Sequence, residues 1–309
     1  MSDPFSGLSF KVGVAENKNS TYRNKMEDVH TYIANFAERV DWGYFAIFDG
    51  HAGKDTARWC GNNLHQLLEK EINSHETTSA PLMGKHDLRE SLNQAFSKAD
   101  DSIEKEGSGS SGCTAAVAVL RWETDPSIDQ SSTPQVEKHS SYEFVPQSYH
   151  RRVLYTSNVG DSRIVLCRRG TPYRLSYDHK ATDVNEINRI REQGGLIMKN
   201  RVNGVLAVTR SLGDSYMKDL VIGKPFTTQT TITDEDEFMI IACDGVWDVI
   251  SDSKACQFVV DQFAEQLDVQ TVAKRLCQLA MDLSTTDNVT VMVVKFESGV
   301  FGETKPVTN

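Results

Sequence analysis

The stretch FMIIACDGVWD, residues 238–248, decides the fold class of this chain. Residues 238–243 are apolar, which predicts a buried strand with side chains alternating between two faces. The pair Asp244-Gly245 ends that strand. The stretch YFAIFDGH, residues 44–51, has the same form and ends in Asp49-Gly50. A single Asp-Gly pair after a strand is usually a turn, but two such strands predict a sheet with acidic groups at its edge.

Two further acidic sites have a similar setting. Glu27 and Asp28 lie in RNKMEDVH, and Asp287-Asn288 begins the apolar run of TTDNVTVMVV. Two carboxylates ~4 Å apart repel by about 4 kcal/mol at an effective dielectric constant of ~20, so a cluster of them requires a cation. Oxygen ligands without Cys or His point to Mg²⁺ or Mn²⁺ rather than to zinc.

The order of the predicted elements argues against a parallel doubly wound sheet. Strands are predicted at 11–14, 27–33, 44–49, 114–121, 153–159, 164–168, 238–243 and 289–296. Helices are predicted at 54–72, 87–103, 184–193, 251–266 and 269–283. Because strands and helices do not alternate strictly, we expect antiparallel sheets with helices packed outside them.

One domain accounts for nearly the whole chain of 309 residues. We expect it to span 11–297, with an N-terminal extension at 1–10 and a C-terminal tail at 298–309. The segment 122–152 is predicted to be a long exposed loop insertion because it is polar and aperiodic. Trp42 and Trp247 are expected in the core, and the six scattered cysteines are expected to be buried, reduced thiols.

Composition excludes some classes of protein. The formal charge of −10 argues against nucleic acid as a partner, because phosphate binding depends largely on Lys and Arg. No signal peptide and no apolar run of ~18 residues is visible, so we expect a protein without membrane association, inside the cell.

Eight motifs, in order, resemble those of one known family. They are RNKMEDVH, FDGHAG, SGCTAAV, NVGDSR, DHKATD, GGLIMKNRVNGVLAVTRSLGD, ACDGVWDV and TTDNVTVMVV. The chain resembles the type 2C, metal-dependent serine/threonine protein phosphatases, most closely the small fungal members. The resemblance implies an α+β fold, a four-layer αββα sandwich in which helices flank two central antiparallel β-sheets.

The resemblance also implies a site that holds two Mg²⁺ or Mn²⁺ ions and a weaker third ion. The residues that match the ligands of the two ions are Glu27, Asp49, Gly50 through its carbonyl, Asp244 and Asp287. Asp161 matches a ligand of the third ion. Arg23 matches the arginine that binds the substrate phosphate, and His51 matches the general acid. The residues expected around these ligands are Asp28, Asp248 and Asn288.

The implied activity is hydrolysis of phosphoserine and phosphothreonine in proteins, by in-line attack of a hydroxide that bridges the metal ions. The resemblance suggests a negative regulator of a stress-activated cascade, with kinases of a MAP kinase pathway as substrates. We expect a monomer located in the cytoplasm and in the nucleus.

Two alternatives remain. A catalytically inactive, phosphatase-like binding scaffold would require loss of ligand carboxylates, which are present. A Mg²⁺-dependent nuclease uses similar chemistry, but the net charge disfavours it. One departure from the family lies at Pro225-Phe226, where relatives have Pro-Glu. It follows the flap beside the active site and bears on substrate docking.

Overall fold

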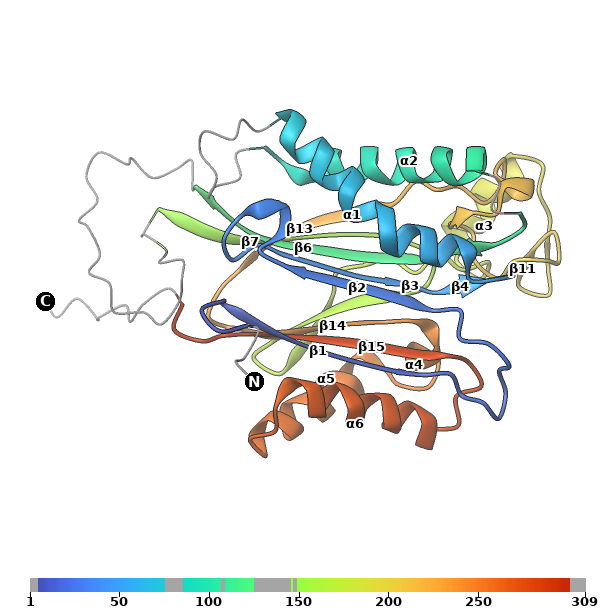
Figure 1. Cartoon of the computed structure of the whole chain (residues 1–309). Helices are drawn as coiled ribbons and strands as arrows, with labels where there is room; N and C mark the ends of the chain where they lie inside the picture. Colours follow the sequence, from blue (N-terminus) through green and yellow to red (C-terminus); the bar gives the residue numbers. More distant parts are fainter. Residues whose placement is uncertain (1–4, 76–85, 107–108, 125–145, 147–148, 301–309) are drawn as a thin grey trace, which may run out of the picture.

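The computed structural model describes residues 5–75, 86–106, 109–124, 146 and 149–300. Figure 1 shows its layers: α1 and α2 lie on one sheet, a second sheet packs beneath the first, and α5 and α6 cover the outer face of the second. This arrangement confirms the predicted α+β sandwich with antiparallel sheets.

The first sheet has the strand order β13-β7-β6-β3-β2, and each neighbouring pair is antiparallel. Its strands are β2 Val29–Ala34, β3 Gly43–Phe48, β6 Ala115–Thr124, β7 His150–Val159 and β13 Phe226–Ile232. The helices α1 Asp55–His75 and α2 Leu88–Glu106 bury Leu64, Leu68 and Phe96 against it. This apolar layer, which includes Trp42, holds the helices on the sheet.

The second sheet has the order β1-β15-β14-β8-β9 and is also antiparallel. Its strands are β1 Phe10–Asn17, β8 Arg163–Arg168, β9 Thr171–Arg174, β14 Asp236–Ala242 and β15 Val289–Phe296. On β14, Met239 and Ile241 face the first sheet, whereas Ile240 and Ala242 face α5 Asp252–Ala264 and α6 Val269–Asp282. The predicted alternation of this strand is therefore confirmed, and both of its faces are buried.

Several short elements connect the strands and helices of the two sheets. They are the 3-10 helices Phe36–Glu38 and Ser215–Met217, the helices α3 Val184–Glu192 and α4 Asp244–Trp247, the hairpin of β10 Ile197–Met198 and β11 Arg201–Val202, and the strands β4 Gly50–His51, β5 Gly112–Cys113 and β12 Leu212–Gly213. All except Phe36–Glu38 lie toward the end at which β4 and β11 are labelled in Figure 1. No helix among the described residues is both long and apolar enough to cross a membrane.

The structure corrects two predicted boundaries. Strand β6 ends at Thr124 and strand β7 begins at His150. Both ends of the segment 122–152 are therefore paired strand. Trp122 and Arg152 face each other in that ladder and are buried. Residues 125–145 and 147–148 lie outside the described part of the chain. The other predicted elements are present with ends shifted by a few residues, and the six cysteines are buried and free.

The strand predicted at 27–33 begins instead at Val29. Glu27 and Asp28 precede it because Asn288 binds their segment: its side-chain oxygen accepts from the Glu27 amide at 2.9 Å, and its side-chain nitrogen donates to the Lys25 carbonyl at 3.0 Å. These bonds replace strand pairing, so the pleat does not set the directions of Glu27 and Asp28.

Candidate active site

A cleft of about 470 Å³ opens at the end of the sandwich. Most of the residues predicted from the sequence to form the site line it: Arg23, Glu27, Asp49, Gly50, His51, Asp161, Asp244, Asp287 and Asn288. Asp28 lies behind this lining, and Asp248 lies exposed beside it. The structure therefore places the predicted residues together, although they come from positions 23 to 288 of the chain.

Strand topology explains this meeting of distant residues. Asp49 follows the end of β3, Asp161 follows the end of β7, and Asp244 follows the end of β14. Asp287 lies two residues before β15, which runs antiparallel to β14. All four strand ends therefore reach the same edge of the sandwich. The four carboxylates lie close together at that edge.

Close packing fixes the segment that carries Glu27 against β4. A β-carbon at Gly50 would lie 2.5 Å from the Glu27 carbonyl oxygen, so position 50 admits only glycine without movement of the backbone. Asn288 holds the same segment through the hydrogen bonds described above. Its side-chain nitrogen also donates a hydrogen bond to the Lys18 carbonyl at 2.8 Å. Asn288 thus positions the backbone on one side of the cleft.

The carboxylates of the cleft carry strongly perturbed pKa values. Burial raises the pKa of Asp49 well above its ordinary range, and the charges of Asp28 and Asp244 raise it further. Burial and the neighbouring charge of Asp161 raise the pKa of Asp244 in the same direction. Burial also raises the pKa of Asp28 to about 6, although the Thr290 hydroxyl donates to it at 2.6 Å. Each shift shows that the buried negative charges lack compensation.

These residues fit a divalent cation. Oδ1 of Asp28 and Oδ1 of Asp244 are buried, and neither has a hydrogen-bond partner among the described residues. Asp28, Asp49 and Cys243 offer donor atoms within 4.8 Å of one another. Burial, together with the charges of Asp28 and Asp49, raises the pKa of the Cys243 thiol well above its usual value, so it stays protonated and is a poor ligand. The remaining oxygens are the donors that Mg²⁺ and Mn²⁺ prefer.

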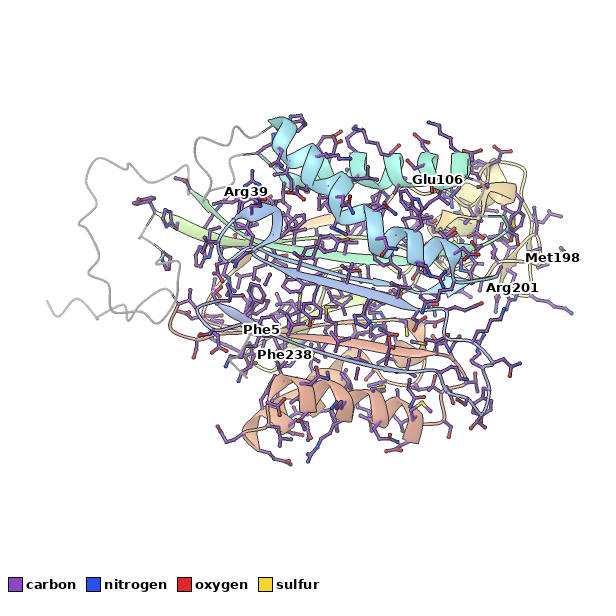
Figure 2. The ribbon with its side chains drawn as sticks, viewed as in Figure 1. Phe5, Arg39, Glu106, Met198, Arg201 and Phe238 are labelled. Atoms are coloured by element: carbon purple, nitrogen blue, oxygen red, sulfur yellow. The ribbon has the colours of Figure 1, made fainter. Side chains whose placement is uncertain are left out.

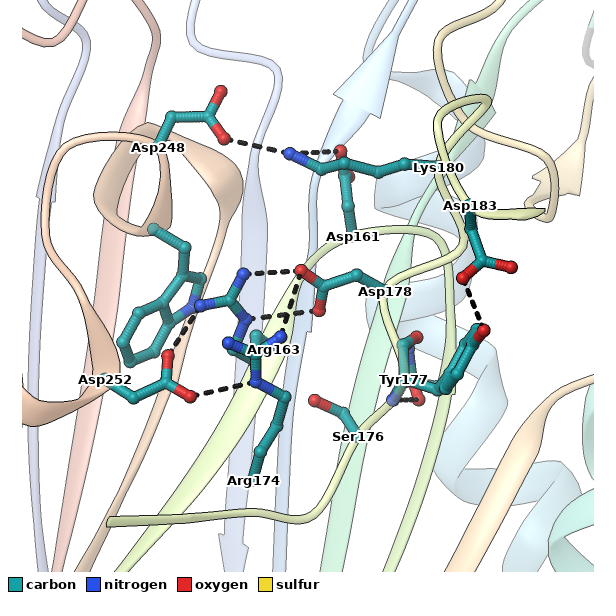
Figure 3. A network of polar contacts seen from close by, with 12 residues as sticks. Asp161, Arg163, Arg174, Ser176, Tyr177, Asp178, Lys180, Asp183, Asp248 and Asp252 are labelled. Atoms are coloured by element: carbon teal, nitrogen blue, oxygen red, sulfur yellow. Dashed lines mark hydrogen bonds and ion pairs between the residues drawn. The ribbon is translucent and has the colours of Figure 1, made fainter. Parts of the chain in front are cut away.

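A lysine lies at one side of the carboxylate group (Figure 3). The Lys180 ammonium is 2.9 Å from Asp248 Oδ1 and 3.5 Å from Asp161 Oδ2. Burial disfavours its charge, but Asp161 and Asp248 outweigh that effect and raise the pKa of Lys180 to about 12. The same ammonium opposes the rise that burial causes in the pKa of Asp161. Asp161 and Asp248 therefore share a fixed positive charge, unlike Asp49.

The two residues expected to handle the substrate each contact an acid. Arg23 donates to Asp287 Oδ2 at 2.6 Å and to the Thr286 carbonyl at 3.1 Å. Its side chain is nearly half exposed at the cleft. His51 Nε2 lies 2.7 Å from Oδ2 of Asp214, whose side chain is fully buried.

Lys180, Asp214 and Arg201 are not among the residues predicted from the sequence. Lys180 belongs to the motif DHKATD and Asp214 ends the motif TRSLGD, so their motifs were visible but their contacts were not. Arg201 comes from β11 and lines the same cleft (Figure 2). These three residues reach the cleft through short elements that carry no periodic signal.

The acidic cleft defines a protein that binds a divalent cation at the end of an α+β sandwich, and comparison with known proteins identifies the family. The family model described as Protein phosphatase 2C matches residues 12–289. The chain is 52% identical over 287 residues to Protein phosphatase 2C homolog 1 of Saccharomyces cerevisiae, which covers 93% of this chain and 94% of that protein. It is 42% identical over 296 residues to the homolog 1 of Schizosaccharomyces pombe, covering 95% and 75% of the two chains. This chain belongs to the protein phosphatase 2C family.

A solved structure agrees with the fold. A phosphatase from a pathogenic strain of Toxoplasma gondii superimposes with a TM-score of 0.72, at 24% identity, covering 94% of each chain. Membership of the family makes the chain a hydrolase of the protein phosphatase type, whose substrates are phosphorylated proteins.

Proposed function

We propose that the protein is a metal-dependent phosphatase that hydrolyses phosphoserine and phosphothreonine in proteins. The carrying observation is the group of carboxylates that raise one another's pKa in a cleft that is also lined by Arg23. Such a group favours binding of divalent cations, and cations beside Arg23 favour binding of a phosphate.

The residues that would hold two Mg²⁺ or Mn²⁺ ions are Glu27, Asp49, the carbonyl of Gly50, Asp244 and Asp287, and Asp161 would contribute to a weaker third site. Bound ions supply Lewis acidity, which makes water nucleophilic at neutral pH and neutralises phosphate charge. Asp28, Asp248 and Asn288 would orient these ligands through their contacts with the surrounding backbone and side chains.

The chain's own side chains then handle the phosphate ester. The Arg23 guanidinium offers two parallel N–H donors to phosphate oxygens, which a lysine could not reproduce. Its contact with Asp287 keeps it at the cleft until a substrate arrives. His51 lines the cleft and provides the proton that the departing serine or threonine oxygen needs.

The proposal extends to the substrates and the location of the protein. The support is the resemblance of the whole chain to small fungal phosphatases that act in stress signalling. We propose kinases of a stress-activated MAP kinase pathway as substrates, and action as a monomer in the cytoplasm and nucleus. Capture of phosphorylated proteins by an Asp49→Asn variant, followed by mass spectrometry, tests the substrate class.

Hydrolysis of a phosphothreonine peptide tests the activity. The purified protein should release phosphate with Mn²⁺ or Mg²⁺ and stop with EDTA. The Asp244→Asn variant should lose both activity and Mn²⁺ binding, the latter measured by isothermal titration calorimetry. Asp282→Asn, an exposed site at the end of α6, is the matched control and should retain both. Activity that persists in EDTA contradicts the metal site, and Mn²⁺ binding without hydrolysis favours the inactive scaffold.

A further inference from the structure

A small three-stranded sheet brings a buried acid to the histidine of the cleft. Its order is β12-β5-β4, with Gly112 of β5 opposite both Gly213 of β12 and His51 of β4. Asp214 directly follows β12, and its backbone amide donates to the Ser111 carbonyl at 3.1 Å. The register therefore places Asp214 and His51 on either side of Gly112.

The contact between these two side chains is closely enclosed. His51 Nε2 lies 2.7 Å from Asp214 Oδ2, which also accepts a hydrogen bond from the buried Ser211 hydroxyl at 2.5 Å. A β-carbon at Gly112 would lie 2.1 Å from Asp214 Oδ2 and 2.5 Å from His51 Nε2. Any other residue at 112 would thus displace the pair, and the site depends on glycine there.

The chemistry of the pair determines which ring nitrogen is free. A carboxylate only accepts hydrogen bonds, so the nitrogen against Asp214, Nε2, carries the hydrogen. The other nitrogen, Nδ1, makes no hydrogen bond to any residue that the structure describes. A buried carboxylate on one ring nitrogen fixes the orientation of the ring and leaves the other nitrogen for chemistry.

We propose that Asp214 is a positioning residue that holds the His51 ring so that Nδ1 gives its proton to the departing oxygen of the substrate. This inference rests on the proposed function. Before this step the ring carries a hydrogen on each nitrogen. When water adds to phosphorus and releases a proton to the solvent, the bond between phosphorus and the serine or threonine oxygen breaks, and its electron pair stays on that oxygen. The oxygen takes the proton from Nδ1, which leaves a neutral imidazole with Nε2–H on Asp214. The products are inorganic phosphate and the free hydroxyl.

Two substrates with different leaving groups separate this role from a structural one. A phosphothreonine peptide releases a poor leaving group that needs a proton, whereas p-nitrophenyl phosphate releases a stable phenolate that does not. Positioned proton transfer contributes ~10²–10⁴-fold, so we expect Asp214→Asn to lower kcat on the peptide by at least ~10-fold. We expect kcat on p-nitrophenyl phosphate to stay close to that of the wild type.

A double variant gives a second, independent readout. In a His51→Gln background, Asp214→Asn should cause no further loss on the peptide, because residues that act as a unit are not additive. Ser211→Ala keeps the Asp214 carboxylate but removes the hydrogen bond that the Ser211 hydroxyl donates to it. This variant should therefore show a smaller loss of kcat on the peptide and none on p-nitrophenyl phosphate. It also keeps the proposal testable should Asp214→Asn fail to fold, as judged by thermal melting.

The outcomes distinguish this inference from the function on which it rests. Equal losses on both substrates, or additive losses in the double variant, would overturn the positioning role alone. Wild-type protein that hydrolyses neither substrate with Mn²⁺ would overturn the proposed function and the positioning role together.

Discussion

Two groups of buried or half-buried carboxylates in this molecule have opposite electrostatic environments. Glu186 of α3 is buried and accepts hydrogen bonds from Arg189 at 3.0 Å, from Arg210 at 2.8 and 3.0 Å, and from the Thr209 hydroxyl at 2.8 Å. Burial alone would raise the pKa of Glu186, but Arg210 and Arg189 lower it to about 2. In the cleft, burial and like charges instead raise the pKa of Asp49.

The difference shows that burial does not decide the role of a carboxylate. Glu186 is compensated by arginines and joins α3 to the segment that precedes β12, so its network serves the fold. Asp49 is surrounded by other acids, which destabilise the fold when no cation is bound. Substitution of a carboxylate of the first kind should lower the stability of the fold. Substitution of one of the second kind should lower the activity.

The largest effect is expected from Asp49→Asn. Loss of a ligand that contributes several kcal/mol of transition-state stabilisation should lower kcat/KM on a phosphothreonine peptide by ~10³-fold. Without metal, the same variant should be more stable by ~1–3 kcal/mol, because an uncompensated buried charge has been removed. Phosphate release and urea unfolding in EDTA measure the two changes.

Asp236→Asn is the matched control for that comparison. Asp236 is buried, and Arg168 binds its two oxygens at 2.8 and 3.0 Å. This variant should lose stability and keep its activity, the reverse of Asp49→Asn. If both variants lose stability in EDTA, the contrast between compensated and uncompensated carboxylates is wrong.

Glu186→Gln should have the next largest effect. Removing one partner from a buried ion network leaves charges unpaired, and we expect the free energy of unfolding to fall by ~3 kcal/mol at pH 7. Hydrolysis of p-nitrophenyl phosphate by the folded protein should change little, because Glu186 does not line the cleft. Urea unfolding and steady-state kinetics measure the two effects.

The pH dependence of this variant tests the cause. The pKa of Glu186 is about 2 in the fold, below its ordinary value of 4.5. The stability that its carboxylate provides is therefore present above pH 4.5 and is lost as the pH falls toward 2. The difference between wild type and Glu186→Gln should shrink over that window, and a constant difference would show that packing, not charge, is the cause.

The strand pattern predicts antiparallel sheets with acids at the strand ends, whereas the four-layer sandwich and the roles of the cleft residues were implied by the family resemblance. Strands such as β3 and β14 are long enough for their apolar alternation to be read, and their ends carry Asp49 and Asp244. Glu27 and Asp28 were assigned to a strand because their local pattern permits it, whereas side-chain bonds from Asn288 decide otherwise. Such long-range bonds leave no mark on local periodicity.

The contacts of Lys180 and Asp214 could not be predicted from the sequence for a related reason. Asp214 meets His51 through two-residue strands whose pairing depends on the completed fold. Lys180 meets Asp161 and Asp248 across a loop and the turn after β7 (Figure 3). Neither contact follows from spacing along the chain, although both residues lie in motifs that the family shares.

The smallest effect is expected at Lys180, where the two kinds of environment meet. Its ammonium compensates Asp161 and Asp248 but adds positive charge beside the place where a cation would bind. A unit charge ~4 Å from a doubly charged ion in water changes the binding energy by about 2 kcal/mol, so Lys180→Met should strengthen Mn²⁺ binding by ~30-fold. Isothermal titration calorimetry measures this affinity without reference to activity.

Lys218→Met is the control. Lys218 pairs with Asp100 outside the cleft, so this variant should leave the Mn²⁺ affinity unchanged. Weaker binding in Lys180→Met would mean that the ammonium chiefly holds the carboxylates in place. The contrast between the cleft and the compensated Glu186 network would then be wrong.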